Sequence, residues 1–100
     1  MEHVDLPERD GDGYLTDMNA WNEVIGRGMA AADDIDLDDE KWEQILQARD
    51  YYATYSAVPP VRKFAKFLGV DTKSLFNTWM TGPMKPITKY GGLPKPTGCV

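Results

Sequence analysis

The sequence predicts a mainly α-helical fold, a small helical bundle. Three observations support this class. Apolar residues recur at three- and four-residue intervals, capping residues precede these runs, and glycine or proline ends them. Only residues 4–15 carry a hairpin signal, and a chain of 100 residues suits a single domain. The expected fold is therefore a bundle with a helix-turn-helix-like pair, a short N-terminal β-hairpin and a flexible C-terminal arm.

The N-terminal elements are a hairpin and a first helix. In VDLPERDGDGYL, residues 4–15, the Asp-Gly pairs are strong turn signals, although Pro7 restricts its strand to an edge. A helix capped by Asp17 or Asn19 then follows, and the acidic run ADDIDLDD ends it. Its apolar stripe consists of Trp21, Val24, Ile25 and Met29.

Three further helices complete the body. Asp38 caps the strongest, about 39–56, whose apolar stripe contains Trp42, Ile45, Leu46, Tyr52 and Tyr55. Pro59-Pro60 ends that helix and begins the next, about 60–68, which stops at Gly69. Asp71 then caps a short helix, about 72–80. The prolines and glycines that follow predict no helix longer than two turns, so we divide the chain into a body, 1–82, and an arm, 83–100.

Charge is distributed unevenly along the chain. The net charge is −5, but residues 1–50 hold fifteen of the sixteen acidic residues, and residues 51–100 hold seven of the eleven Lys and Arg. The expected arm carries Lys85, Lys89 and Lys95 and no acidic side chain. Such an arrangement steers binding partners and says little about the fold.

Several function classes are disfavoured by the residues present. One histidine, His3, and one cysteine, Cys99, argue against a catalytic triad and against a metal site. The acidic run 33–39 lacks the glycine and glutamate of a calcium loop, and no Gly-rich phosphate loop occurs, so we expect no cofactor. The sequence has no apolar run long enough to span a membrane and no signal-peptide pattern. A single cysteine fits a reducing compartment, and we expect a cytoplasmic protein.

Residues 61–79, VRKFAKFLGVDTKSLFNTW, have the layout of a helix-turn-helix. The second helix of such a pair reads DNA, but here it offers one cation, Lys73. The other cations, Arg62, Lys63 and Lys66, lie on the first helix, and the rest of the chain is acidic. This balance disfavours direct DNA binding, although a DNA-binding regulator remains an alternative.

The most informative residue is Cys99, the last but one. A thiolate on a solvent-accessible arm can attack a sulfane sulfur of another protein and carry it as a persulfide. Pro94 and Pro96 stiffen the arm, and Gly98 removes bulk beside the thiol. We therefore expect Cys99 to be the reactive residue and Lys85, Lys89, Lys95 and Gly98 to assist docking of partner proteins.

The segment GLPKPTGCV, residues 92–100, preceded by TK of TKYGG, resembles the C-terminal signature of the DsrC/TusE family, also called sulfite reductase gamma subunits. Looser similarity covers DGYL, KWEQILQARDYYATY and the GP before the arm. The resemblance implies a helical bundle with an N-terminal hairpin and a flexible arm. It also implies that Cys99 carries sulfur.

The resemblance is closer to the single-cysteine TusE type. Family members that serve dissimilatory sulfite reductase have a second cysteine where this chain has Thr88. The implied function is a sulfur relay in which a donor protein loads Cys99 and an acceptor enzyme receives the sulfur, with tRNA 2-thiouridine as one expected destination. This is a sulfurtransferase-type carrier rather than a stand-alone enzyme. A DsrC-like partner of sulfite reductase or of sulfur-oxidation proteins remains the alternative within the family.

Overall fold

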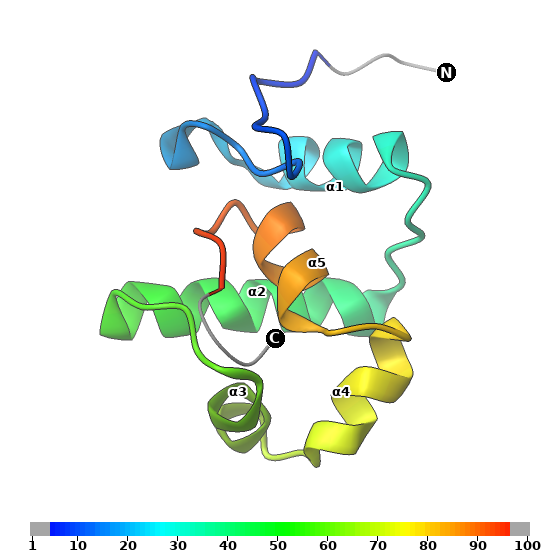
Figure 1. The fold of residues 1–100 in the computed structure, drawn as a ribbon, viewed down its shortest axis with the longest axis vertical. Helices are drawn as coiled ribbons and strands as arrows, with labels where there is room; N and C mark the ends of the chain where they lie inside the picture. The colour runs from blue at the N-terminus through cyan, green and yellow to red at the C-terminus, as the bar shows by residue number, and fades with distance from the viewer. Residues whose placement is uncertain (1–4, 97–100) are drawn as a thin grey trace.

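The computed structural model describes residues 5–96, and their regular secondary structure is helical (Figure 1). A short 3-10 turn, η1, covers Met18–Ala20. Five α-helices follow: α1 Glu23–Ala32, α2 Asp39–Tyr55, α3 Val61–Leu68, α4 Thr72–Trp79 and α5 Met84–Tyr90. Within this described range, no helix combines the length and apolarity needed to cross a bilayer.

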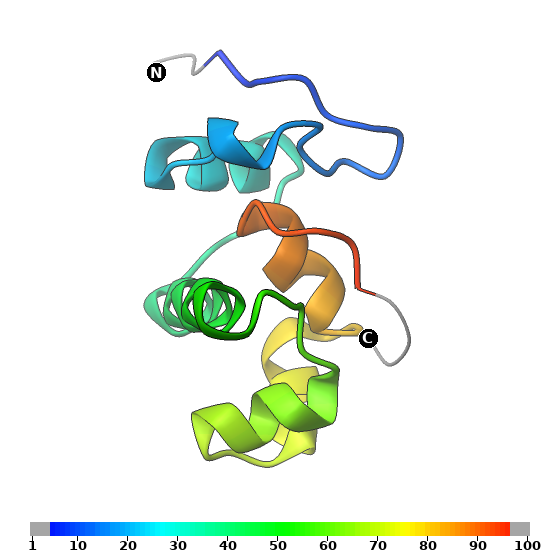
Figure 2. The ribbon, with the colours of Figure 1, turned by 90° about the vertical axis from the view of Figure 1, so that its left-hand side faces the viewer.

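The short helix α5 lies at the centre of the molecule. It packs against both α1 and α2, and it lies between them in both views (Figures 1 and 2). Helices α3 and α4 contact each other at the end of the molecule opposite α1. The fully buried side chains come from all five helices and include Met29, Ile45, Phe64, Leu75, Met84, Ile87 and Thr88.

The middle helices match the expected ranges to within one residue at each end. The carboxylate of Asp38 accepts a hydrogen bond from the Lys41 amide at 2.8 Å, so it caps α2 as predicted. Gly69 ends α3 in the left-handed conformation, with φ of 75°. Asp71 occupies the N-cap position of α4, but its side chain makes no capping hydrogen bond, so that detail of the prediction is wrong.

The first helix begins later than predicted. Asp17 caps the 3-10 turn through the Asn19 amide, and the side chain of Asn22 caps α1 through the Ile25 amide. Trp21 therefore precedes α1 and does not belong to its apolar stripe. Because Trp21 lies outside a helix, its ring can turn towards the segment that follows α5.

The predicted N-terminal β-hairpin is wrong. Residues 5–16 form a tight loop with one isolated antiparallel bridge, between Arg9 and Leu15, and no strand occurs among the described residues. The physical reason lies in the loop itself. Asp10 accepts the amides of Asp12 and Tyr14, which closes the chain, and Pro7 has no amide to extend the pairing.

Residues 84–93, which we expected to belong to the arm, include a buried helix and a buried turn. Two prolines led to the error, because they suggested an interrupted segment. Pro83 is the N-cap of α5, and Pro86 is its third residue. Amides in the first turn of a helix have no intrahelical partner, so prolines cost little there. The chain thus leaves the core after Leu93, and the arm remains a prediction for residues 94–100.

Candidate functional site

The site is built around the segment that leads from α5 towards Cys99. Cys99 and Gly98 lie outside the described residues, which end at Pro96. The structure does place the residues that hold this segment to the body and those that surround its last described residues. Both groups of residues include side chains that lie far from this segment in the sequence.

Two side chains hold the turn after α5. The indole nitrogen of Trp21 donates a hydrogen bond to the Tyr90 carbonyl at 2.8 Å. The guanidinium of Arg49 lies over the Trp21 ring, 3.8 Å from its centroid, and donates to the Gly91 carbonyl. These carbonyls end α5 and lack helical partners, so both hydrogen bonds satisfy groups that would otherwise be unpaired. Burial lowers the pKa of Arg49, but a guanidinium stays charged.

A second contact anchors α5 from the side of α1. The hydroxyl of Tyr90 donates a hydrogen bond of 2.8 Å to Asp33, which also pairs with Arg9 at 2.6 Å. The hydrogen bond from Arg9 is the main reason that the pKa of Asp33 lies below its ordinary value. Desolvation, followed by the bond to Asp33, raises the pKa of Tyr90 well above its usual range, so this hydroxyl stays protonated.

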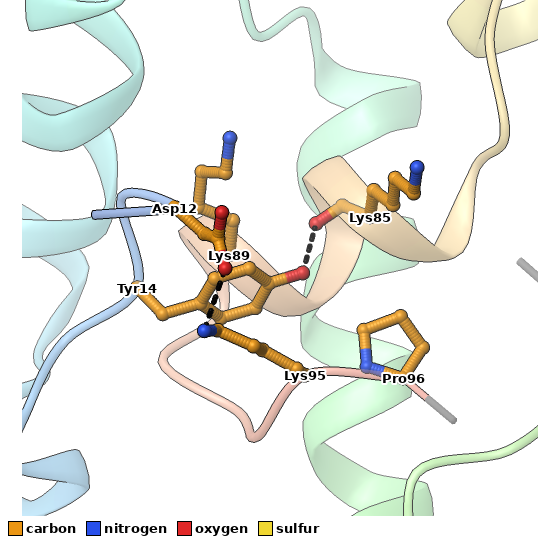
Figure 3. A pocket seen from close by; sticks show the side chains of 6 residues that line it. All are labelled: Asp12, Tyr14, Lys85, Lys89, Lys95 and Pro96. Atoms are coloured by element: carbon orange, nitrogen blue, oxygen red, sulfur yellow. Dashed lines mark hydrogen bonds and ion pairs between the residues drawn. The ribbon is translucent and has the colours of Figure 1, made fainter. Parts of the chain in front are cut away.

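A pocket of about 330 Å³ lies beside the last described residues (Figure 3). It is lined by Asp12, Tyr14, Lys85, Lys89, Lys95 and Pro96. The three lysines named from the sequence therefore meet at one place. Lys85 and Lys89 come from α5, and Lys95 comes from the segment after it. Figure 3 shows Lys89 and Lys95 beside the ring of Tyr14, with the Lys85 side chain extending away from that ring. Lys85 and Lys89 give this concave surface a positive charge that attracts anionic groups, whereas Asp12, which also lines it, is paired with Lys95.

Lys95 differs from the other two lysines. Its ammonium nitrogen lies 2.7 Å from a carboxylate oxygen of Asp12 and 3.2 Å from one of Asp10. The hydrogen bond to Asp12, followed by that to Asp10, raises the pKa of Lys95. Within the described range neither Lys85 nor Lys89 takes part in an ion pair, so these two present the less compensated positive charge.

Thr88, which stands where some family members have a cysteine, is completely buried beside this pocket. Its hydroxyl donates to the Met84 carbonyl at 2.7 Å, and the Tyr14 hydroxyl lies 2.9 Å away. The single proton of the Tyr14 hydroxyl can be donated to Thr88 or, over the longer distance of 3.2 Å, to the Lys85 carbonyl (Figure 3). Burial raises the pKa of Tyr14, so its hydroxyl stays protonated. Thr88 thus serves the packing of α5 against the N-terminal loop.

Sequence reasoning missed Asp10, Asp12 and Tyr14. The Asp-Gly-Asp-Gly segment forms a turn, as its residues predict, but its carboxylates also contact Lys95, more than eighty positions further along the chain. The opposite charges of the two segments are the only signal that could have suggested this pairing. Nothing in the local pattern specifies which acidic residues a lysine will meet.

The structure also bears on the helix-turn-helix segment and on metal binding. In α3, the side chains of Arg62, Lys63 and Lys66 are exposed, and α4 adds only Lys73 as a cation. Between residues 5 and 96, no three His, Cys, Asp or Glu side chains are grouped so that they could hold a metal ion.

Comparison with known proteins identifies the family. The family model described as DsrC like protein matches residues 4–100. The chain belongs to the DsrC-like family. The resemblance seen in the C-terminal signature is therefore confirmed, and the match covers the site and the segment that carries Cys99.

DsrC-like relatives agree with the chain over nearly its whole length. The Haemophilus influenzae protein named Sulfurtransferase TusE homolog is 39% identical, with 93% of this chain and 92% of the relative covered. Sulfurtransferase TusE of Escherichia coli is 31% identical with the same coverage. Among solved DsrC structures, that of Allochromatium vinosum has a TM-score of 0.80 at 36% identity, covering 92% of this chain and 88% of the other. The oxidized gamma-subunit of dissimilatory sulfite reductase from Archaeoglobus fulgidus has a TM-score of 0.78 at 32% identity, covering 94% and 92%.

Proposed function

We propose that this protein is a cytoplasmic sulfur carrier of the TusE type. Its only cysteine, Cys99, accepts a persulfide sulfur from a donor protein and passes it to an acceptor enzyme, on a route towards 2-thiouridine in tRNA. The observation that carries the proposal is the family match, which extends through residue 100 and so includes Cys99. The relatives named Sulfurtransferase TusE support the TusE type.

The chemistry needs one thiolate and no cofactor. The Cys99 thiolate attacks the terminal sulfur of a donor persulfide, the donor's sulfur–sulfur bond breaks, and the donor leaves as a thiolate. Cys99 then bears the persulfide, whose terminal sulfur is transferred when an acceptor thiolate attacks it. A chain with Thr88 and a single cysteine cannot close an intramolecular disulfide, so each transfer involves a partner.

The lysine pocket supports a docking role for that partner. Lys85 and Lys89 line the surface beside Pro96, three positions before Cys99, and their charge favours a partner that is acidic around its own reactive sulfur. In this proposal Lys85 and Lys89 attract the partner, Gly98 leaves room beside the thiol, and the helical body presents the segment.

Intact-mass measurement tests the carrier function. The protein is incubated with a persulfidated donor, and the mass is measured without reducing agent. We expect the gain of one sulfur atom, its location on Cys99 by peptide mapping, and no gain in Cys99→Ser. If the mass does not change, or if the serine variant gains as much sulfur, the carrier proposal is wrong.

A second candidate is a binding partner of a sulfite reductase without two-cysteine chemistry. It is favoured by the similarity to structures of the gamma subunit of dissimilatory sulfite reductase and to a chain in the structure of dissimilatory sulfite reductase I. Pull-down with intact protein and with a chain truncated after Leu93, where the chain leaves the core, separates the two functions. Retention of a sulfite reductase by the intact protein, combined with no sulfur on Cys99, would favour the second candidate.

A further inference from the structure

The ion pairs of Lys95 join the two ends of the described chain. Asp10 and Asp12 belong to the N-terminal loop, whereas Lys95 belongs to the segment that leads to Cys99. The ammonium group also lies 5.8 Å from the centroid of the Tyr14 ring. Figure 3 shows it beside this ring and the Asp12 carboxylate. This contact brings the loop directly to the base of the proposed sulfur-carrying segment.

The loop has internal contacts that are independent of Lys95. One oxygen of the Asp10 carboxylate accepts the amides of Asp12 and Tyr14 at 2.9 and 3.0 Å, which leaves the other oxygen for Lys95. Gly13 takes the left-handed conformation, with φ of 87°, and its carbonyl accepts a hydrogen bond from Arg9 at 2.7 Å. The Asp10 carboxylate is therefore held in place by the loop's own contacts, and the backbone of Asp12 is held through its amide, whereas the Asp12 carboxylate is positioned by Lys95 itself.

The segment on either side of Lys95 has little freedom. Leu93 is buried, and Pro94 and Pro96 restrict their own φ angles. Cys99 follows Lys95 by only four positions, and a chain of that length spans at most about 14 Å. The position of Lys95 therefore sets the centre of the volume that the thiol can reach.

We propose that Asp10 and Asp12 are positioning residues for sulfur transfer and act by holding Lys95. This inference rests on the proposed carrier function and adds to it a role for the N-terminal loop. Holding Lys95 reduces the freedom of the segment before a partner arrives, so less entropy is lost when the thiol enters the partner's active site. The ion pairs are exposed, hence weak and sensitive to salt.

The experiment compares two double variants of equal charge. Asp10→Asn/Asp12→Asn removes the carboxylates that face Lys95. Asp36→Asn/Asp50→Asn removes two exposed carboxylates that form no ion pair within residues 5–96. Two quantities are measured for each protein: the second-order rate of sulfur transfer from a persulfidated donor to Cys99, and the backbone nitrogen relaxation of Lys95 by NMR.

We expect the second-order rate of sulfur transfer to Cys99 to be about two- to five-fold lower in the Asp10/Asp12 variant at limiting donor. A change of this size corresponds to the loss of two weak, exposed ion pairs. Its Lys95 amide becomes more mobile, while the control variant matches the wild type in both measurements. High salt weakens these ion pairs, so it should reduce the difference in rate between the wild type and the Asp10/Asp12 variant. Exchanging the charges, with Asp12→Lys and Lys95→Asp together, should restore order at residue 95 relative to Lys95→Asp alone.

The outcomes distinguish the two proposals. If the wild type gains sulfur and the Asp10/Asp12 variant equals it in rate and in relaxation, the positioning role is wrong while the carrier function stands. If the wild type gains no sulfur, the carrier function fails and the role in transfer fails with it. Thermal unfolding monitored by circular dichroism confirms that all variants are folded.

Discussion

The indole ring of Trp21 occupies the space that a side chain on Gly92 would need. A Cβ built on Gly92 would lie 2.5 Å from ring atoms of Trp21, and Gly92 also has a positive φ of 66°. Trp21 in turn is held by its hydrogen bond to Tyr90 and by Arg49. The glycine that begins the C-terminal signature is thus a packing requirement of the body.

Replacing Gly92 should destabilise the fold. We expect Gly92→Ala to lower the free energy of unfolding by about 2–4 kcal/mol, because the change adds a clash with Trp21 to backbone strain. Gly69→Ala is a matched control: Gly69 has a similar φ of 75°, but a Cβ added there would meet no heavy atom within 4 Å. Urea denaturation measures both. Equal losses in the two variants would show that the Trp21 contact contributes nothing.

Replacing Arg49 with lysine should destabilise the fold. A lysine keeps the charge but cannot stack a planar group on Trp21 while donating to the Gly91 carbonyl. We expect Arg49→Lys to lower the free energy of unfolding by about 1–3 kcal/mol. Arg27→Lys is the control, since exposed Arg27 stacks over Trp42 without an ion pair in the described part of the chain; its loss should stay below about 1 kcal/mol. Similar losses would contradict the role of the Gly91 hydrogen bond.

Stability should fall in acid partly through Asp33. Its pKa is held below 3.8, chiefly by the hydrogen bond from Arg9, so its contribution is present above the ordinary carboxyl pKa. That contribution is lost as the pH falls through the lower pKa of the folded state. We expect the free energy of unfolding to decrease as the pH falls below the ordinary carboxyl pKa of 3.8 and through the lower pKa of the folded state, and Asp33→Asn to show a shallower decrease. Identical slopes for the two proteins would refute this assignment.

The buried hydroxyl pair of Tyr14 and Thr88 should show energetic coupling. Thr88→Val keeps the shape of the side chain and removes its hydroxyl, and Tyr14→Phe removes the other partner. Each change should cost about 0.5–1.5 kcal/mol, and the double variant should lose less than their sum. A double-mutant cycle from urea denaturation measures the difference. Strict additivity would mean that the 2.9 Å contact adds no stability.

Some of the fold follows from local patterns alone. Helices α2, α3 and α4 were predicted because their apolar stripes, the cap at Asp38 and the stop at Gly69 are local signals. The predicted hairpin was wrong because a turn signal does not show whether strands flank the turn. Helix α5 was missed because a proline signal does not show whether a helix begins at the proline or is interrupted by it. Pro86 looked like a helix breaker and lies in the one turn of a helix that tolerates it.

The helical class, the family and the single thiol at position 99 can be obtained from the amino-acid sequence, because they depend on periodicity, on a contiguous motif and on a count. Three relationships required the folded chain: Lys85, Lys89 and Lys95 share one pocket, Lys95 meets Asp10 and Asp12, and Trp21 lies against Gly92. The last two join residues about seventy or more positions apart. Local sequence carries no record of such pairings, since they arise only when α5 is buried between α1 and α2.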